Sequence, residues 1–169
     1  MNEIDIAALV LRIGLGVMIA LHGWNKIKSA GSRAATASWF ASIGMRAPRL
    51  QAASAAWTEI VSGVLLATGL FVPTATGALI ATMVVAIVVA HRSNGFFIFN
   101  EGQGWEYCAI IIVAALAVGS LGGGRASLDH AFGVEYGGLW GFWTALILGV
   151  GGAALHLIAS YRPACPDKP

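Results

Sequence analysis

Residues 52–90 read AASAAWTEIVSGVLLATGLFVPTATGALIATMVVAIVVA, and this stretch decides the fold. It contains two apolar runs, residues 52–72 and 74–90, and its one charged side chain is that of Glu59. Each run approaches the ~20 residues that cross a bilayer core as a helix. Because Pro73 alone separates the runs, we expect a tight hairpin of two membrane-spanning helices.

Three further apolar windows extend this pattern, at residues 4–21, 105–121 and 139–159. Charged residues make up only 11% of the chain, whereas a soluble domain carries about a quarter. Helices also satisfy their backbone hydrogen bonds internally, as hydrocarbon requires. The sequence therefore predicts an all-α fold, a polytopic membrane helix bundle of five spans that contacts membrane lipid.

Lysine and arginine are distributed unevenly among the loops. Only Arg125 lies in the loops on the side of the N-terminus, and Arg12 lies within the first span. By the positive-inside rule, we expect a multi-pass protein of the inner (plasma) membrane, with its N-terminus outside and its C-terminus in the cytoplasm. The scattered cations do not suggest a nucleic-acid partner. The eight on the predicted cytoplasmic side are Lys26, Lys28, Arg33, Arg46, Arg49, Arg92, Arg162 and Lys168.

Two loops have structure of their own. Residues 32–45 form an amphipathic stretch, with Trp39 and Ile43 on one face, that we expect to lie flat at the inner interface. The Phe-Phe-Ile-Phe run at residues 96–99 is too short to span the membrane and too apolar for water. It is either an interfacial anchor or a lid over a site.

Ionisable side chains inside membrane spans cost free energy unless they are paired or hydrated, so each marks a candidate functional site. Arg12 lies about 15 Å above His22 on the same helix, at 1.5 Å per residue. Glu59 is the one acidic residue expected near that depth, so we predict an Arg12–Glu59 pair. With alternating spans, five residues converge on the cytoplasmic third: His22, Lys26, Glu59, His91 and Glu106.

Three interpretations of this set remain open. The His and Glu residues are ligand types that suit iron or manganese, although the spacing lacks an E-x-x-H pair. Alternatively, His and Lys hydrogen-bond the carbonyls of a quinone while a carboxylate relays protons and aromatic side chains pack the ring. The third interpretation is a structural polar network. His156, in the last span, is expected to face the membrane interface.

Between residues 6 and 130, short sequence pieces occur in the order typical of one family. In that order they resemble the DoxX family of small bacterial membrane proteins. The pieces are Leu11-Arg12-Ile13-Gly14-Leu15-Gly16, His22-Gly23-Trp24-Asn25-Lys26, Glu59 with Gly63, Thr68-Gly69-Leu70-Phe71, His91, residues 94–97, Glu106-Tyr107 and residues 124–129.

The resemblance implies a four-span core at residues 1–130, with residues 131–169 as an additional transmembrane helix and a short tail. It also implies a redox environment, because the family is similar to the membrane subunit of an archaeal thiosulfate:quinone oxidoreductase, and other members are linked to oxidative-stress complexes and thiol homeostasis. The resemblance also implies six candidate ligand-binding positions: Arg12, His22, Lys26, Glu59, His91 and Glu106.

The leading hypothesis is a membrane component of a quinone- or thiol-linked redox system that binds a lipid-soluble molecule near the cytoplasmic face. In it His22, His91 and Glu106 exchange protons with the inner aqueous side, and Lys26 stabilises charge on a reduced ring. The alternative is a non-catalytic scaffold that docks soluble oxidoreductases at the basic loop, residues 26–49. Few polar side chains line the outer halves of the spans, which disfavours a solute exporter. The sequence leaves homo-oligomer formation open.

Overall fold

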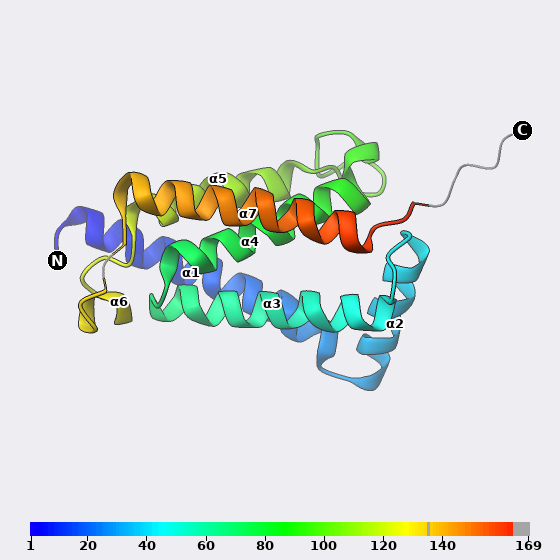
Figure 1. Cartoon of the computed structure of the whole chain (residues 1–169), viewed down its shortest axis with the longest axis horizontal. Coiled ribbons are helices and arrows are strands. Elements are labelled where there is room, and N and C mark those ends of the chain that lie inside the picture. The colour runs from blue at the N-terminus through cyan, green and yellow to red at the C-terminus, as the bar shows by residue number, and fades with distance from the viewer. Residues whose placement is uncertain (135, 164–169) are drawn as a thin grey trace, which may run out of the picture.

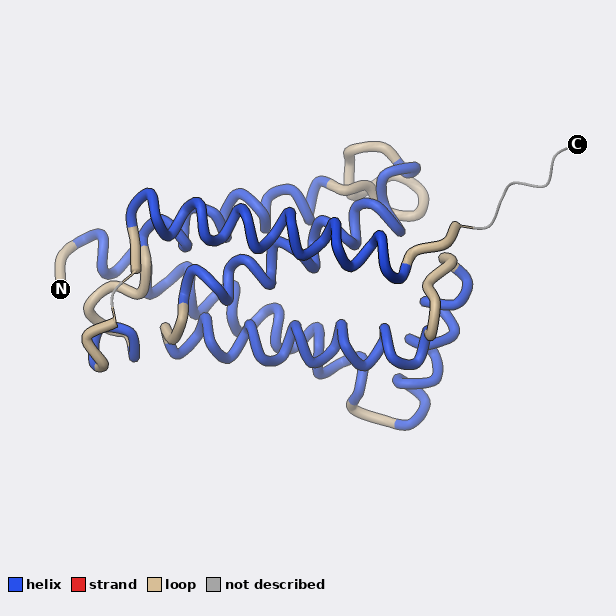
Figure 2. The backbone as a smooth tube through the Cα atoms, in the orientation of Figure 1, coloured by secondary structure: helices blue, strands red, loops and turns tan. Residues whose placement is uncertain are grey.

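The computed structural model describes residues 1–134 and 136–163, so Lys168 of the expected tail lies outside the described residues. Five long helices run side by side along the bundle, and the short helices α2 and α6 lie at its opposite ends (Figure 1). Apart from two short helical turns after α4 and one isolated β-bridge, the rest of the described chain is loop (Figure 2). The helices are α1 (Glu3–Ile27), α2 (Ala30–Ser42), α3 (Pro48–Thr68), α4 (Val72–Ala86), α5 (Glu106–Leu121), α6 (Leu128–Ala131) and α7 (Gly138–Ser160).

Among the described residues, four helical segments are long and apolar enough to cross a membrane: Glu3–Ile27, Pro48–Thr68, Val72–Asn94 and Gly138–Ser160. Helix α5 is also apolar but has only 16 residues, which span about 24 Å at 1.5 Å per residue. The predicted all-helical membrane bundle is confirmed, with four full-length candidate spans and one shorter helix.

The predicted hairpin between α3 and α4 is confirmed. Gly69 ends α3 with a φ of 71°, a left-handed conformation that suits glycine. Phe71 precedes α4 with a φ of 49°, and Pro73 lies in the first turn of α4, where a missing N–H costs nothing. The carboxylate of Asp129 accepts hydrogen bonds from the backbone N–H groups of Phe71 and Val72, at 2.8 and 3.1 Å. The short helix α6 therefore caps α4.

Beyond α4 the helix widens into the π-helical turn η1 (Ile87–His91), and a 3₁₀ turn, η2 (Arg92–Asn94), follows it. The apolar run at residues 74–90 did not predict this change of pitch. Such π-helical turns are rare and are found frequently at functional sites. His91 is the last residue of this turn.

Glycines fix how α1 packs against α3. A Cβ atom at Gly16 would lie 2.6 Å from the carbonyl oxygen of Gly63, and one at Gly63 would lie 2.5 Å from that of Gly16. About two turns further along α1, a Cβ atom at Gly23 would lie 2.5 Å from the carbonyl oxygen of Ala56. Backbones that approach so closely gain dispersion contacts, which drive helix association in lipid. These contacts set one antiparallel register for the two helices.

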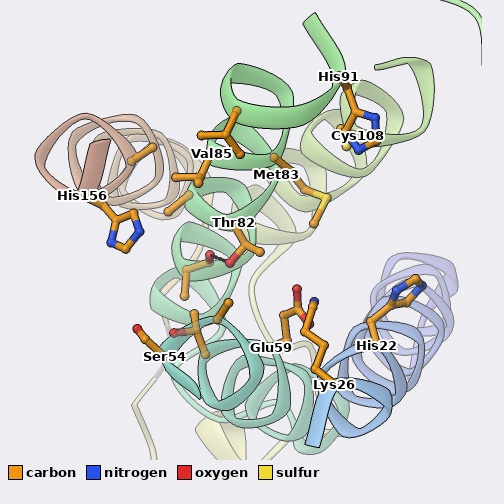
Figure 3. Close-up of a pocket in the computed structure, with 18 of the residues that line it drawn as sticks. His22, Lys26, Ser54, Glu59, Thr82, Met83, Val85, His91, Cys108 and His156 are labelled. Atoms are coloured by element: carbon orange, nitrogen blue, oxygen red, sulfur yellow. Dashed lines mark hydrogen bonds and ion pairs between the residues drawn. The ribbon is translucent and has the colours of Figure 1, made fainter. Parts of the chain in front are cut away.

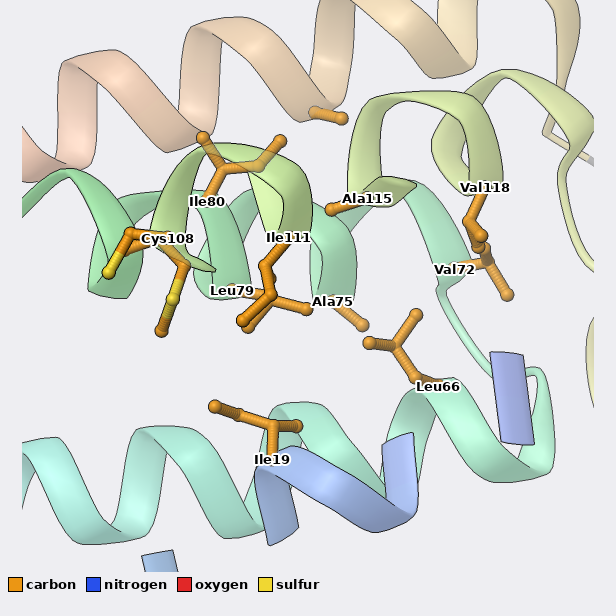
Figure 4. Close-up of a cluster of buried hydrophobic side chains, with 12 residues drawn as sticks. Ile19, Leu66, Val72, Ala75, Leu79, Ile80, Cys108, Ile111, Ala115 and Val118 are labelled. Carbon is orange, nitrogen blue, oxygen red and sulfur yellow. The ribbon is translucent and has the colours of Figure 1, made fainter. Parts of the chain in front are cut away.

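The apolar core lies where α4 and α5 meet α1 and α3 (Figure 4). Ile19 of α1, Leu66 of α3 and Leu79 of α4 are at most 2% exposed there. Helix α7 packs against α4 and α5 instead of α1. A Cβ atom at Gly77 of α4 would lie 2.8 Å from that of Leu148, which marks the close approach of α4 and α7.

The two ends of the bundle differ in charge. The end at α2 exposes the cations Lys28, Arg33, Arg46, Arg49, Arg92 and Arg162, whereas Arg125 lies at the end at α6. Helix α2, which covers most of the predicted amphipathic stretch, runs across its end of the bundle and packs Phe40 against Met45 and Ala52 (Figure 1). The alternating direction of the long helices thus brings the lysine- and arginine-bearing loops together at the α2 end, as the sequence predicted.

Large apolar side chains cover the outer faces of the long helices. On α7, Trp140 is 83% exposed and Leu155 and Ile158 are each 71% exposed. Exposed apolar surface on this scale is a site of contact with another apolar phase. In a multi-pass membrane protein that phase is lipid.

Candidate ligand-binding site

A cavity of about 630 Å³ lies among α1, α3, α4, α5 and α7, toward the α2 end of the bundle. Four of the six residues singled out in the sequence line it: His22, Lys26, Glu59 and His91. Figure 3 shows these side chains, which come from two helices, α1 and α3, and from the end of η1. The convergence expected from alternating spans is therefore present for these four. The volume is in the range that holds small-molecule ligands.

An ion pair between Lys26 and Glu59 lies on the cavity wall (Figure 3). The side chain of Glu59 is only 5% exposed, whereas that of Lys26 is 24% exposed. The ammonium group of Lys26 has N–H donors that do not bond to Glu59, and the carboxylate of Glu59 has a second oxygen that can accept. The pair therefore offers a ligand both a hydrogen-bond donor and an acceptor.

His22 lies on the α1 side of the same cavity. Its ring centroid is 6.4 Å from that of Tyr107 at the start of α5, with the two planes tilted by 37°. The Tyr107 hydroxyl donates to the sulfur of Met18, 2.8 Å away. Cys108 and Met83 line the wall nearby. This side of the cavity thus combines an imidazole with aromatic and sulfur-containing surfaces.

His91 is oriented by a backbone contact. Its Nδ1 lies 2.8 Å from the carbonyl oxygen of Gln103. Since a carbonyl oxygen only accepts, Nδ1 carries the proton, and Nε2 is the acceptor in a neutral ring. The contact therefore assigns the tautomer and leaves a second ring nitrogen for another partner.

Arg12 does not belong to this cavity, and the prediction of an Arg12–Glu59 pair is wrong. The side chain is fully buried and donates to the carbonyl oxygens of Leu66, at 3.3 Å, and Ala126, at 2.7 Å. Asp129 is the charge that acts on it electrostatically. The register set by the glycines places Glu59 level with Gly23, about 16 Å along α1 from Arg12. Arg12 therefore ties the α6 end of the bundle together.

Glu106 is also absent from the cavity wall. Its carboxylate accepts a hydrogen bond from the backbone N–H of Ile98, at 3.1 Å. That bond holds the loop of residues 95–104, whose Ile98, Gln103 and Gly104 line the cavity. The aromatic run is thus divided: Ile98 covers the cavity, whereas Phe99 is 80% exposed.

His156, which was expected to face the membrane interface, lines the cavity from α7 and is half-buried. Ser54, Thr58 and Thr82 also line the wall and were not singled out in the sequence. They stand among other polar residues of α3 and α4, and only the packing of α3 and α7 on α4 shows which of these point into the cavity. Within residues 1–134 and 136–163, no group of three or more His, Cys, Asp or Glu residues has the arrangement of a metal site.

Comparison with known proteins gives one family. The family model for DoxX matches residues 7–92, just over half of the chain. The matched segment contains His22, Lys26, Glu59 and His91, whereas Glu106 and His156 lie beyond it. No curated protein and no solved structure gave a match.

Proposed function

Because the chain belongs to the DoxX family and is a multi-pass membrane helix bundle, we propose that it is the membrane component of a redox system. In this proposal the cavity among α1, α3, α4 and α7 binds a small lipid-soluble molecule. The observation that carries the proposal is the convergence of His22, Lys26, Glu59 and His91 on one largely apolar cavity. Apolar walls with a few convergent polar groups are the usual form of a ligand site.

The polar groups of the cavity suit the two carbonyls of a quinone ring, which is our candidate ligand; a thiol-linked ligand is the other class. The Lys26 ammonium donates a hydrogen bond to one ring oxygen and favours negative charge on it. His22 and His91 hold protons within reach of the α2 end of the bundle. Electrons come from a partner protein or from the substrate.

Two further expectations complete the proposal. The charge difference between the ends of the bundle supports a cytoplasmic position for α2 and an outside position for the N-terminus. Residues 1–130 are the family core, and α7 is an addition that closes one side of the site, since Leu148, Gly152 and His156 line it.

A spectroscopic titration with a tailless benzoquinone tests the proposal. We expect Lys26→Ala and His22→Ala to weaken binding about tenfold, since a hydrogen bond to a charged group contributes about 1.5–3 kcal/mol. Lys28→Ala is the matched control, because Lys28 is exposed and does not line the cavity. Equal dissociation constants for Lys26→Ala, His22→Ala and the control would refute the site.

The alternative function is a scaffold that docks a soluble oxidoreductase at the α2 end. It is supported by four exposed cations, Lys28, Arg33, Arg46 and Arg49, and by the absence of any acidic residue between Asp5 and Glu59 in the sequence. Neutralising the four cations should then abolish co-purification with an oxidoreductase, whereas His22→Ala should not. The reverse pattern would remove the scaffold hypothesis.

A further inference from the structure

The cavity does not end at the polar groups. It continues along α4 between α3 and α7, which both pack on α4. Across from the Lys26–Glu59 pair this part of the wall is made of small or apolar side chains. The residues that line it are Ser54, Thr74, Ala78, Ala81, Leu148 and Gly152.

This groove is open along its side and closed at one end. Ser54, Thr74 and Leu148 are exposed, so the groove opens on the lipid-facing surface between α3 and α7. At the α2 end the two helices are joined, because Gln51 Nε2 donates to Ser160 Oγ at 2.9 Å and Arg46 N–H donates to the Ser160 carbonyl at 2.8 Å. A molecule therefore reaches the groove from the membrane and not from that end.

The groove has a polar end and an apolar end, as an amphiphilic ligand does. Its polar groups lie toward the α2 end, whereas Thr74 lies near the start of α4, at the α6 end. The stretch of α4 from Thr74 to Thr82 is about 12 Å long at 1.5 Å per residue. A molecule whose polar head is at the Lys26–Glu59 pair would direct an apolar chain along α4 toward the middle of the bilayer.

We propose that the ligand is an amphiphile with a polar ring or head at the Lys26–Glu59 pair and an alkyl or isoprenoid chain in the groove between α3 and α7. This inference rests on the proposed function and adds the class of ligand and its route of access. A compact polar solute would not contact the groove. An alkyl or isoprenoid chain would cover the apolar wall of the groove, which lipid or detergent would otherwise contact. His156 also lines the cavity from α7, one turn from Ser160.

Two adjacent glycines provide a matched pair of variants. Gly152 lines the groove, and a Cβ atom there would lie 3.7 Å from that of Ala81, so a larger side chain enters the space. Gly151 has no neighbour within 4 Å of an added Cβ atom and points away. Leucine at either position changes the intrinsic helix preference of α7 equally. Gly152→Leu should therefore fill the groove, while Gly151→Leu should not.

The experiment titrates full-length protein in detergent with a tailless benzoquinone and with the same ring bearing a ten-carbon chain. In wild type and Gly151→Leu, we expect the chain to tighten binding. In Gly152→Leu, we expect the ratio of the two dissociation constants, tailless ring over chain-bearing ring, to fall by roughly tenfold relative to Gly151→Leu. Ala78→Leu approaches the groove from α4 and serves if Gly152→Leu does not fold.

The outcomes separate the two proposals. If the tailless ring binds but the chain gives the same advantage in all variants, the groove does not hold the chain and this inference fails alone. If neither probe binds wild-type protein, the proposed function fails and the inference fails with it.

Discussion

The ion pair between Lys26 and Glu59 makes an asymmetric prediction about stability. Lys26→Met leaves the Glu59 carboxylate, whose side chain is 5% exposed, without its partner. Removing one member of a fully buried pair costs about 3–5 kcal/mol. Because Lys26 is 24% exposed, water screens part of this interaction, and we expect a loss of about 2–3 kcal/mol. That loss lowers the melting temperature by roughly 5–10 °C for a chain of this size.

The opposite substitution should cost less. In Glu59→Gln the ammonium of Lys26 keeps its access to water, and the amide oxygen still accepts a hydrogen bond, so we expect a loss of about 1 kcal/mol. The double variant leaves no buried charge and should lose less than the sum of the two single variants, by about 1 kcal/mol or more. Residues of one interaction are expected to be non-additive in this way.

Thermal unfolding in one detergent, followed by circular dichroism, measures all four proteins. The reasoning is refuted if Glu59→Gln is the more damaging change, or if the two losses simply add. The double variant also separates stability from function. It should be folded, yet bind the tailless benzoquinone no better than Lys26→Ala.

Three further predictions concern packing and loops. Gly16→Ala should destabilise the protein by about 1–3 kcal/mol, because its Cβ atom meets the α3 backbone, whereas Gly14→Ala, with nothing within 4 Å, should be neutral or stabilising in the same melting assay. Asp129→Ala should lower stability by about 2–3 kcal/mol through loss of two charge-assisted bonds to the start of α4, and a melting temperature equal to wild type would contradict that role. Glu106→Ala should speed hydrogen exchange at the Ile98 amide, whereas Glu106→Gln should speed it less, because the amide oxygen of Gln can still accept this hydrogen bond. Equal exchange rates in the two variants would show that the bond does not hold the loop.

Much of the fold follows from composition. The apolar windows predict the long helices within a few residues at most ends, and Pro73 predicts the α3–α4 hairpin. The alternation of spans then brings His22, Lys26 and Glu59 to one end of the bundle. These features depend on local hydropathy and on chain direction, both of which are visible in the sequence.

The partners of buried charges depend instead on helix register. Depth counted along separate helices placed Arg12 near Glu59, whereas the contact of Gly16 with Gly63 shifts α1 so that Arg12 meets the end of α3. The groups that accept hydrogen bonds from Arg12 are the backbone carbonyls of Leu66 and Ala126. Every residue has such a carbonyl, so the sequence does not indicate which ones Arg12 contacts. The inward face of His156 likewise depends on how α7 packs on α4, which an apolar helix does not reveal.

The central claim is that the cavity holds a lipid-soluble molecule with its head at the Lys26–Glu59 pair. A density map of the full-length protein with the ten-carbon benzoquinone tests it most directly. We predict density for the ring within hydrogen-bonding distance of Lys26, with the chain running along α4 past Gly152. Ring density on the outer face of the bundle, with the cavity filled by ordered side chains or left empty, would contradict the account.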